Sequence, residues 1–435
     1  MMEKTLRQSV AQKQSVSLVT ASKKWAQIGL LSFGGPAAQI ALMHQLLVEQ
    51  MRWFKEKEFV NALSFCMLLP EPEAMQLATY SGWRMHGKLG GFIAGLLFVL
   101  PGAIVILILA MTYSLFGDVP FIKTLFLGVK AAVLVVVIES LLRIANKALK
   151  LATLKVIALL AFIGIFFFNI PYPLIVLSAA LFGFFYIREQ IVDGEVSSVR
   201  PKGFSGLIKT VLIMLCIWWV PVLLIDAIFY EQRILLEIGL FFSRLAVVTF
   251  GGAYAVLAYM GQDVVNHWGW LTAGEMMDGL GLAETTPGPL ILVTEFVGFL
   301  AAYREGGLGL GIAGAMMTLW VTFVPCFLWV FAGAPYIEWI CAQPKLKGAL
   351  TAISAAVVGV ILNLSVWFGL HVMFLNVEQT QFGMITLWQP QWTSIDWKVA
   401  LLTLMCGLLT FQFHWSIFKV LITSSMVGIV MAMLF

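Results

Sequence analysis

The chain has 435 residues and a formal net charge of +4, and 60% of its residues are hydrophobic while only 11% are charged. Soluble globular domains carry about 25% charged residues, whereas here apolar stretches of roughly 20 residues, enough to cross a bilayer, recur along almost the whole chain. These features exclude a soluble globular protein and predict an integral membrane protein.

The basic residues are unevenly distributed, because 20 of the 27 lysines and arginines precede residue 211. They cluster at the N-terminus and at 84–88, 143–155 and 188–209. Basic clusters beside apolar spans mark the cytoplasmic side of a membrane protein. Because no basic soluble domain accompanies them, we do not expect the chain to bind nucleic acid.

The first 24 residues are polar and lack the apolar core of a signal peptide. We therefore expect residues 1–24 to form a cytoplasmic tail that is not cleaved. The five cysteines are scattered along the chain, and they show neither the spacing of a metal site nor that of a disulfide framework. No bound metal is expected.

About thirteen hydrophobic segments follow the tail, and they predict an all-α integral membrane protein with about 13 transmembrane or re-entrant helices. Six segments precede a polar stretch, a seventh follows it, and six more complete the chain. The segments lie near 25–50, 58–83, 89–116, 119–142, 151–169, 172–187, 206–230, 235–262, 273–302, 306–333, 347–373, 397–413 and 415–434.

This order divides the chain into five parts. They are the tail at 1–24, a first transporter repeat at 25–188, a cytoplasmic linker at 189–205, a connector helix at 206–231 and a second transporter repeat at 232–435. If each segment crosses once, the basic clusters are cytoplasmic, the loop from Arg52 to Glu58 is external, and the two termini lie on opposite sides.

An internal repeat relates the two halves. Phe33-Gly34-Gly35 matches Phe250-Gly251-Gly252 at an offset of 217, and from 33 to 72 this offset gives 13 identities in 40 positions. Further along, Lys123 matches Lys347 at an offset of 224. With six segments, one connector and six more, the second repeat is inverted, as in many secondary transporters whose sites lie at the midplane. The alternative is that the duplicated helices are only a scaffold.

Two kinds of break interrupt the apolar runs in both halves. One is the glycine pair, Gly34-Gly35 and Gly251-Gly252. The other is the proline pair, Pro70-Glu71-Pro72 and Pro287-Gly288-Pro289. Proline removes a backbone donor and glycine loosens a helix. We expect half-helices to start just after Pro72 and Pro289, near the midplane, where their free N–H groups can bind an anion. The alternative is an ordinary proline kink.

Polar residues beside the breaks complete the predicted anion site. They are Gln39, Glu73 and Gln76 in the first half and Thr285 and Thr286 in the second. Ionisable residues inside a membrane are functional candidates by default. The candidates for coupling are Glu71, Glu73, Lys130, Glu139, Arg244 and Glu284. Arg244 is expected to face the bundle interior, and Glu139 has a structural alternative in an i,i+4 pair with Arg143.

A stretch that imitates a nucleotide-binding loop, Gly82 to Leu89, has leucine where a phosphate-binding loop needs a hydroxyl residue. The chain also offers no soluble α/β domain to hold a nucleotide. We therefore expect neither ATP-driven pumping nor any cofactor, and the chain shows no metal-binding histidine pair or acidic cluster of a membrane enzyme.

Several of these stretches together resemble the chromate ion transporter family. The likeness rests on Ser32 to Pro36, Phe65 to Pro70, Gly128 to Val133 and Thr285 to Pro289, and it covers about 25–188 and 235–435. The resemblance implies a multi-pass protein of the bacterial inner (plasma) membrane that exports chromate, in the long, two-domain form. One departure is Glu71, where the family usually has glycine.

Chromate or a sulfate-like oxyanion is therefore the expected substrate. Protons are a candidate coupling ion, membrane lipid is the expected surrounding, and a homodimer is a candidate assembly. The membrane potential, proton coupling or both would drive export. The alternatives are a transporter of sulfate or another oxyanion, and an anion channel, which would show a continuous polar pore.

Overall fold

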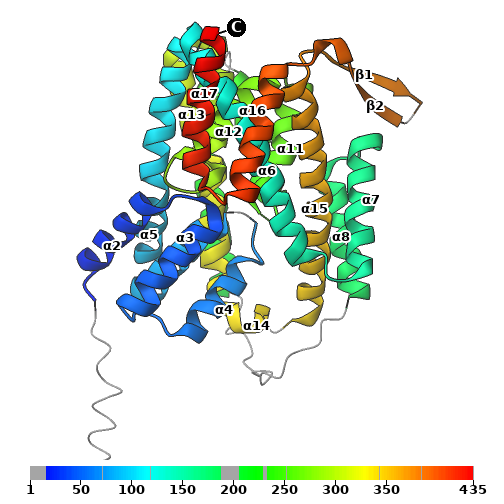
Figure 1. Cartoon of the computed structure of the whole chain (residues 1–435). Coiled ribbons are helices and arrows are strands. Elements are labelled where there is room, and N and C mark those ends of the chain that lie inside the picture. Colours follow the sequence, from blue (N-terminus) through cyan, green and yellow to red (C-terminus); the bar gives the residue numbers. More distant parts are fainter. Residues whose placement is uncertain are drawn as a thin grey trace, which may run out of the picture.

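The computed structural model describes residues 16–70, 72–117, 119–187, 205–228, 233–250, 252–341, 343–383 and 385–434. The described chain is mostly helical (Figure 1). Within it, five helices are long and apolar enough to cross a membrane, namely Glu73–Phe116, Pro120–Ala148, Gly206–Ile228, Leu290–Cys341 and Pro344–Met373. The protein is therefore a multi-pass helical membrane protein.

The first half, defined here as residues 16–187, contains three short helical segments, two long helices and a final short pair. They are α2 (Leu18–Leu31), α3 (Gly35–His44) with a π-helical extension (Gln45–Gln50), α4 (Glu56–Cys66), α5 (Glu73–Phe116), α6 (Pro120–Ala148), α7 (Ala152–Phe168) and α8 (Tyr172–Tyr186). The connector α9 (Ser205–Ile228) leads to the second half.

The second half, residues 233–434, contains the same kinds of element in the same order. They are α10 (Arg233–Val248), α11 (Ala253–Gln262) with a π-helical extension (Asp263–His267), α12 (Ala273–Thr285), a 3-10 turn η3 (Leu290–Leu292), α13 (Val293–Gly333), a 3-10 turn (Ala334–Tyr336), α14 (Ile337–Cys341), α15 (Pro344–Met373), α16 (Trp397–Gly407) with a π-helical extension (Leu408–Gln412), and α17 (Ile417–Leu434).

One element departs from the all-α expectation. Strands β1 (Val377–Phe382) and β2 (Ile385–Pro390) pair antiparallel between α15 and α16. Gly383, with a φ of +63°, lies at the turn between them, and β-branched and aromatic residues favour strands on either side. This hairpin lies at the edge of the molecule (Figure 1), away from the breaks in the helices.

The helix α5 is two limbs joined by a sharp turn. His86 and Gly87 have non-helical backbone angles, and the φ of Gly87 is +64°, which favours glycine. Gly82 packs directly against the backbone of Gly90, so the chain folds back on itself. Helix α13 turns in the same way at Gly307.

In the first half the chain turns back at its breaks, so the loop before α4 and the turn in α5 lie at the same end of the molecule. His44, at the end of α3, contacts Glu56 at the start of α4 at 2.8 Å. Glu58 lies 3.9 Å from Arg84, at the end of the first limb of α5. The expectation that the 52–58 loop lies opposite residues 84–88 is therefore wrong. A hydropathy run reports apolar length and not whether the chain crosses or turns back, and the breaks turn it back.

The connector α9 carries the chain from one end of the molecule to the other. Lys88, beside the turn in α5, donates a hydrogen bond to Thr210 near the start of α9 at 3.0 Å. Further along, Trp218 donates to Ser243 on α10 at 3.2 Å. In Figure 1, α2, α3 and α4 gather at the lower end, while α11, α12 and the C-terminus lie in the upper part.

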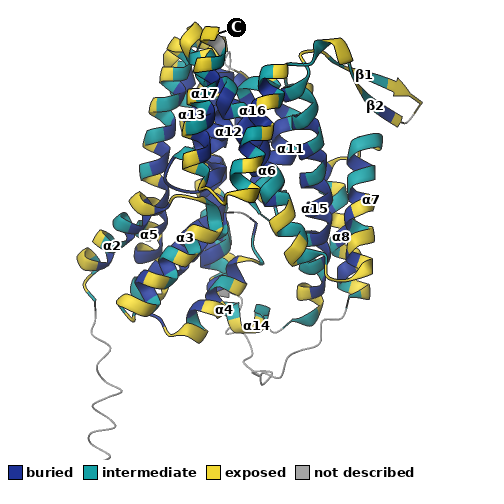
Figure 2. Cartoon of the chain, in the orientation of Figure 1, coloured by how far each residue is buried: buried dark blue, intermediate teal, exposed yellow. Residues whose placement is uncertain are grey.

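The two halves are intertwined. Helices α7 and α8 pack on α15, whereas α16 and α17 pack on α6, and α5 packs against α13. Glycines allow the close approach, since Gly128 packs against Ser424 and Gly183 against Gly348. Buried segments lie between α5, α6, α13 and α15, while exposed positions mark the outer surfaces (Figure 2). On α9 the exposed residues beyond Lys209 are apolar, as contact with lipid requires.

Candidate functional site

Four breaks separate the short helices from the helices that follow. The first-half breaks are Ser32–Gly34, before α3, and residues 67–72, before α5; the second-half breaks are Thr249–Gly252, before α11, and Thr286–Pro289, before η3 and α13. None of the helices that follow has a side-chain cap at its start. The first N–H groups of each helix therefore keep their capacity to bond a ligand. Glu71 and Gly251 lie outside the described residues.

The glycines of the first type of break hold backbone conformations that other residues avoid. The φ angles of Gly34 and Gly35 are +85° and +78°, and that of Gly252 is +116°. A side chain added to Gly35 or Gly252 would meet no atom within 4 Å. The backbone thus faces open space at both of these positions.

The breaks of the two halves meet. The backbone N–H of Gly288 donates to the carbonyl oxygen of Ser32 at 2.8 Å, and Gln39 Nε2 donates to the carbonyl oxygen of Gly288 at 2.6 Å. Pro287 packs against Gly102, near the middle of the long limb of α5. The first-half glycine break and the second-half proline break therefore form one assembly deep in the molecule.

The two glutamines of the predicted site hold the breaks in shape. Gln39 Nε2 bonds backbone carbonyls of both halves, and Gln76 Nε2 donates to the carbonyl oxygen of Pro70. Both side chains are buried, and their Oε1 atoms have no hydrogen-bond partner. Both N–H groups of Gln39 are therefore used to position the backbone, and Gln76 positions the backbone through one of its two N–H groups.

The two threonines also direct their hydroxyl protons to the backbone. Thr285 donates to the carbonyl oxygen of Leu282 at 2.8 Å, and Thr286 donates to that of Ala283 at 3.0 Å. These bonds close the last turn of α12. The predicted threonines therefore terminate α12 in this structure and do not offer their hydroxyl protons to an anion.

The predicted coupling residues differ in their burial and in their partners. Glu284 is buried and accepts a hydrogen bond from Tyr254 at 2.6 Å. Glu73 is half-buried at the first position of α5, and Glu139 pairs with Arg143 at 3.7 Å, as the i,i+4 spacing indicates. The expectation that Arg244 faces the interior is wrong, because its side chain is exposed.

Two cations near the breaks come from one helix. Arg143 and Lys147 lie one turn apart on α6, and both are exposed. Arg143 acts electrostatically on Glu284, and Lys147 acts on Glu73. Sequence reasoning counted Lys147 only as part of a cytoplasmic basic cluster, and Arg143 as part of that cluster and as the possible partner of Glu139. Their i,i+4 spacing was the available signal, since it places both on one face.

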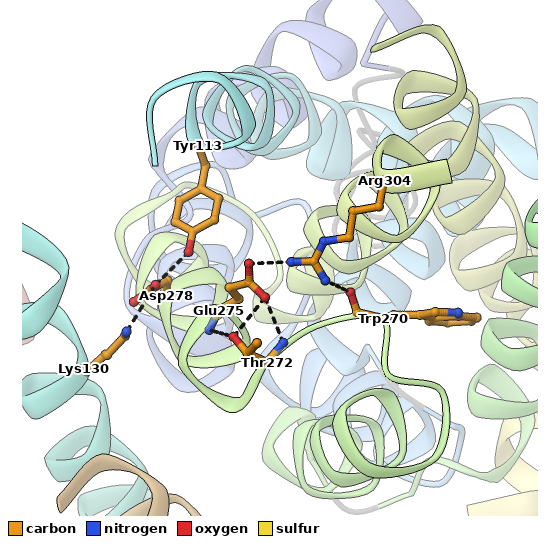
Figure 3. A network of polar contacts seen from close by, with 7 residues as sticks. All are labelled: Tyr113, Lys130, Trp270, Thr272, Glu275, Asp278 and Arg304. Carbon is orange, nitrogen blue, oxygen red and sulfur yellow. Dashed lines mark hydrogen bonds and ion pairs between the residues drawn. The ribbon is translucent and has the colours of Figure 1, made fainter. Parts of the chain in front are cut away.

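A network of polar contacts ties α12 to its neighbours (Figure 3). Asp278, which is buried, accepts a hydrogen bond from Tyr113 on α5 at 2.8 Å and lies 3.6 Å from Lys130 Nζ on α6. Glu275 pairs with Arg304 at 2.5 Å. Lys130 was among the predicted residues, but Asp278 was missed. Its signal was a carboxyl within an apolar run, which inside a membrane marks a functional candidate.

The described residues contain no group of three or more histidine, cysteine, aspartate or glutamate side chains that could hold a metal ion. The chemistry on offer is instead that of uncapped helix starts, open glycine backbone, and the nearby cations Arg143 and Lys147. Such a combination is suited to holding an anion through hydrogen bonds and charge, without a covalent bond.

Comparisons with known proteins identify the family of the chain. The family model described as "Chromate transporter" matches residues 19–184 and 236–431. The chain is 33% identical to the "Chromate transport protein" of Pseudomonas aeruginosa over 78% of each chain. It is 29% identical to the "Probable chromate transport protein" of Synechococcus elongatus over 81% of this chain and 85% of that one. No solved structure matches significantly. The chain belongs to the chromate transporter family and is a membrane transport protein, not an enzyme.

Proposed function

We propose that this protein exports chromate across the bacterial inner membrane through a central anion site. One observation carries the proposal: the glycine break of the first half is bonded to the proline break of the second through Ser32, Gln39 and Gly288, beside glycine backbone that faces open space. The relatives are named as chromate transport proteins, which supports chromate as the substrate.

The order of the elements supports an inverted repeat. Each half begins with three short helices, continues with a helix that turns at Gly87 or Gly307, and ends with a long helix and a short pair. In Figure 1, α2, α3 and α4 of the first half lie at the lower end of the molecule, and α11 and α12 of the second half lie in the upper part. In secondary transporters this arrangement surrounds a substrate site near the bilayer midplane.

The proposed site uses the positive ends of helices. The starts of α3 and α11 present N–H groups beside Gly35 and Gly252, and the helix dipole favours a negative ligand there. Arg143 and Lys147 attract a dianion toward the breaks from the exposed face of α6. The carboxyls of Glu73 and Glu284 lie near these cations and are the proposed proton carriers.

The membrane potential supports export as the direction. Moving one charge through the potential is worth about 2.3 kcal/mol per 100 mV, so a dianion leaving a negative cytoplasm gains about 4.6 kcal/mol. This corresponds to a concentration ratio of about 2000-fold. The basic residues Lys88, Lys150 and Lys155 belong to the clusters that mark the cytoplasmic side, and they support the topology that export requires.

Competition in vesicles tests the substrate. Inside-out vesicles that contain the protein are loaded with isotopic chromate in the presence of excess unlabelled chromate, sulfate or molybdate. We expect saturable uptake that unlabelled chromate abolishes. Uptake that sulfate inhibits more strongly than chromate would instead assign sulfate, and uptake that does not saturate would favour a channel.

A further inference from the structure

The helices α4 and α12 occupy equivalent places in the two halves but differ in what covers them. The offset of 217 pairs Val60 with Met277 and Met67 with Glu284. Val60 and Met67 are 46% and 39% exposed, whereas Met277 and Glu284 are 1% and 5% exposed. One face of α4 is therefore open, and the matching face of α12 is closed.

The closed face of α12 lies on α6. Gly281 packs against Val129 on α6, and no side chain fits between them. Beside this contact, Lys130 lies 3.6 Å from Asp278 and Tyr113 donates to Asp278 at 2.8 Å (Figure 3). The seal thus consists of an apolar contact and a charged contact between α12 and its neighbours.

The open face of α4 has no such cover. It carries Asn61 and Ser64, which are both exposed and polar, at the positions that match Asp278 and Gly281. Helix α4 packs against α5 and α14. In Figure 1 it stands apart from α15, which is the counterpart of α6, and its outer surface is exposed in Figure 2.

We propose that this structure is the state of the transporter that is open at the α4 end and shut at the α12 end, and that Asp278, Lys130 and Tyr113 form the latch at the shut end. The proposal rests on the proposed function, since it describes how the central site changes sides. In the opposite state α4 docks on α15 and α12 leaves α6. Under the proposed topology the open end is cytoplasmic, so the central site is ready to load its substrate.

The latch differs in chemistry from its counterpart. The positions that match Asp278 and Lys130 are Asn61 and Ser354, which carry no charge. Opening the α12 end must separate a partly buried ion pair, whereas opening the α4 end does not. Separating such a pair leaves a charge without its partner and is costly. The latch therefore biases the two-state equilibrium toward closure at the α12 end.

Accessibility of matched cysteines tests the latch without any measurement of transport. In a background with the five native cysteines replaced, Val60→Cys and Met277→Cys are exposed to a membrane-impermeant maleimide from each side of the membrane. We expect rapid labelling of Val60→Cys from the α4 side and almost none of Met277→Cys. Adding Asp278→Asn should raise the labelling rate of Met277→Cys from the α12 side by about tenfold. The same substitution should lower the labelling rate of Val60→Cys from the α4 side.

Three further variants make the test specific. Lys130→Gln and Tyr113→Phe should act in the same direction as Asp278→Asn, and the exchanged pair Lys130→Asp with Asp278→Lys should restore closure. Glu305→Gln is the matched control, because Glu305 is an exposed carboxyl of the same half that lies outside the polar network of Figure 3. Its labelling should equal that of the parent.

The latch is refuted if Met277→Cys labels no faster in any of the three latch variants, or if Val60→Cys is not labelled. Chromate flux measured in the same vesicles separates this outcome from a failure of the proposed function. If labelling shifts as expected but no chromate flux is measured, the latch is supported and chromate is rejected as the substrate. Chromate flux with unchanged labelling keeps the substrate and rejects the latch.

Discussion

Gln39 of the first half donates a hydrogen bond from Nε2 to the carbonyl oxygen of Gly288 in the second half, at 2.6 Å and 249 positions away along the chain. Both residues are buried. The bond joins a side chain of α3 to the backbone of the break after α12, so a change at Gln39 reaches the backbone of the second-half break directly. In this way the protein fixes the relative position of the two helix starts.

We expect Gln39→Leu to reduce chromate flux strongly while the protein still inserts into the membrane. The leucine is of similar size but leaves the Gly288 carbonyl without its donor, and an unsatisfied buried group costs about 1–3 kcal/mol. Gln50→Leu is the control, since Gln50 is exposed at the end of α3. Flux per molecule of inserted protein is the measurement, and equal flux in the two variants would show that Gln39 does not position the site.

We expect Gly35→Leu and Gly252→Leu to abolish flux. Each substitution forces a left-handed backbone on a residue that disfavours it by about 1–2 kcal/mol and fills the open space beside the helix start. Gly309→Leu is the matched control, because a side chain at Gly309 also meets open space but its φ is not positive. Normal flux in a well-expressed Gly35→Leu or Gly252→Leu protein would reject the anion site.

We expect Arg143→Gln to raise the chromate concentration that gives half-maximal flux by about tenfold, because a charge-assisted contact to an anion contributes about 1.5–3 kcal/mol when it is complete and less when it is exposed. Arg143→Lys keeps the positive charge, so it should raise this chromate concentration less than Arg143→Gln does. Lys150→Gln, at an exposed position just after α6, should leave the concentration dependence unchanged. A maximal rate that falls with no change in this concentration dependence would argue against attraction of the substrate.

We expect Glu73→Gln and Glu284→Gln to change the pH dependence of flux, since each removes a titrating carboxyl beside the breaks. In Glu284→Gln the amide oxygen can still accept the hydrogen bond of Tyr254, so the local packing is preserved. The exposed Glu305→Gln is the control. Flux measured across a pH series gives the comparison, and identical profiles in all four proteins would rule out these carboxyls as proton carriers.

The starts of the helices after the breaks follow from the sequence. Proline has local backbone requirements, so Pro72 and Pro289 predict that helical segments begin just after them, and α5 begins at Glu73 and η3 at Leu290. The start of α3 at Gly35, inside the glycine pair, was not predicted. The offset of 217 also identifies which positions of α4 and α12 correspond, and this correspondence underlies the comparison of Val60 with Met277.

The path of the chain could not be read in the same way. An apolar run of 25 residues fits either one crossing or two short helices that return, and hydropathy does not distinguish them. The turn at Gly87 depends on one left-handed residue within an otherwise helical pattern. The role of Asp278 depends on Lys130 and Tyr113, which lie more than 140 residues earlier, and no local pattern indicates such a contact.

The most direct measurement of the central claim is chromate accumulation in inside-out vesicles with an imposed inside-positive potential and no nucleotide. We expect the vesicles to concentrate chromate severalfold or more and to lose it when an ionophore dissipates the potential, while vesicles without the protein do neither. The account would be contradicted if accumulation required ATP. It would also be contradicted if chromate accumulated only in right-side-out vesicles with an imposed pH gradient.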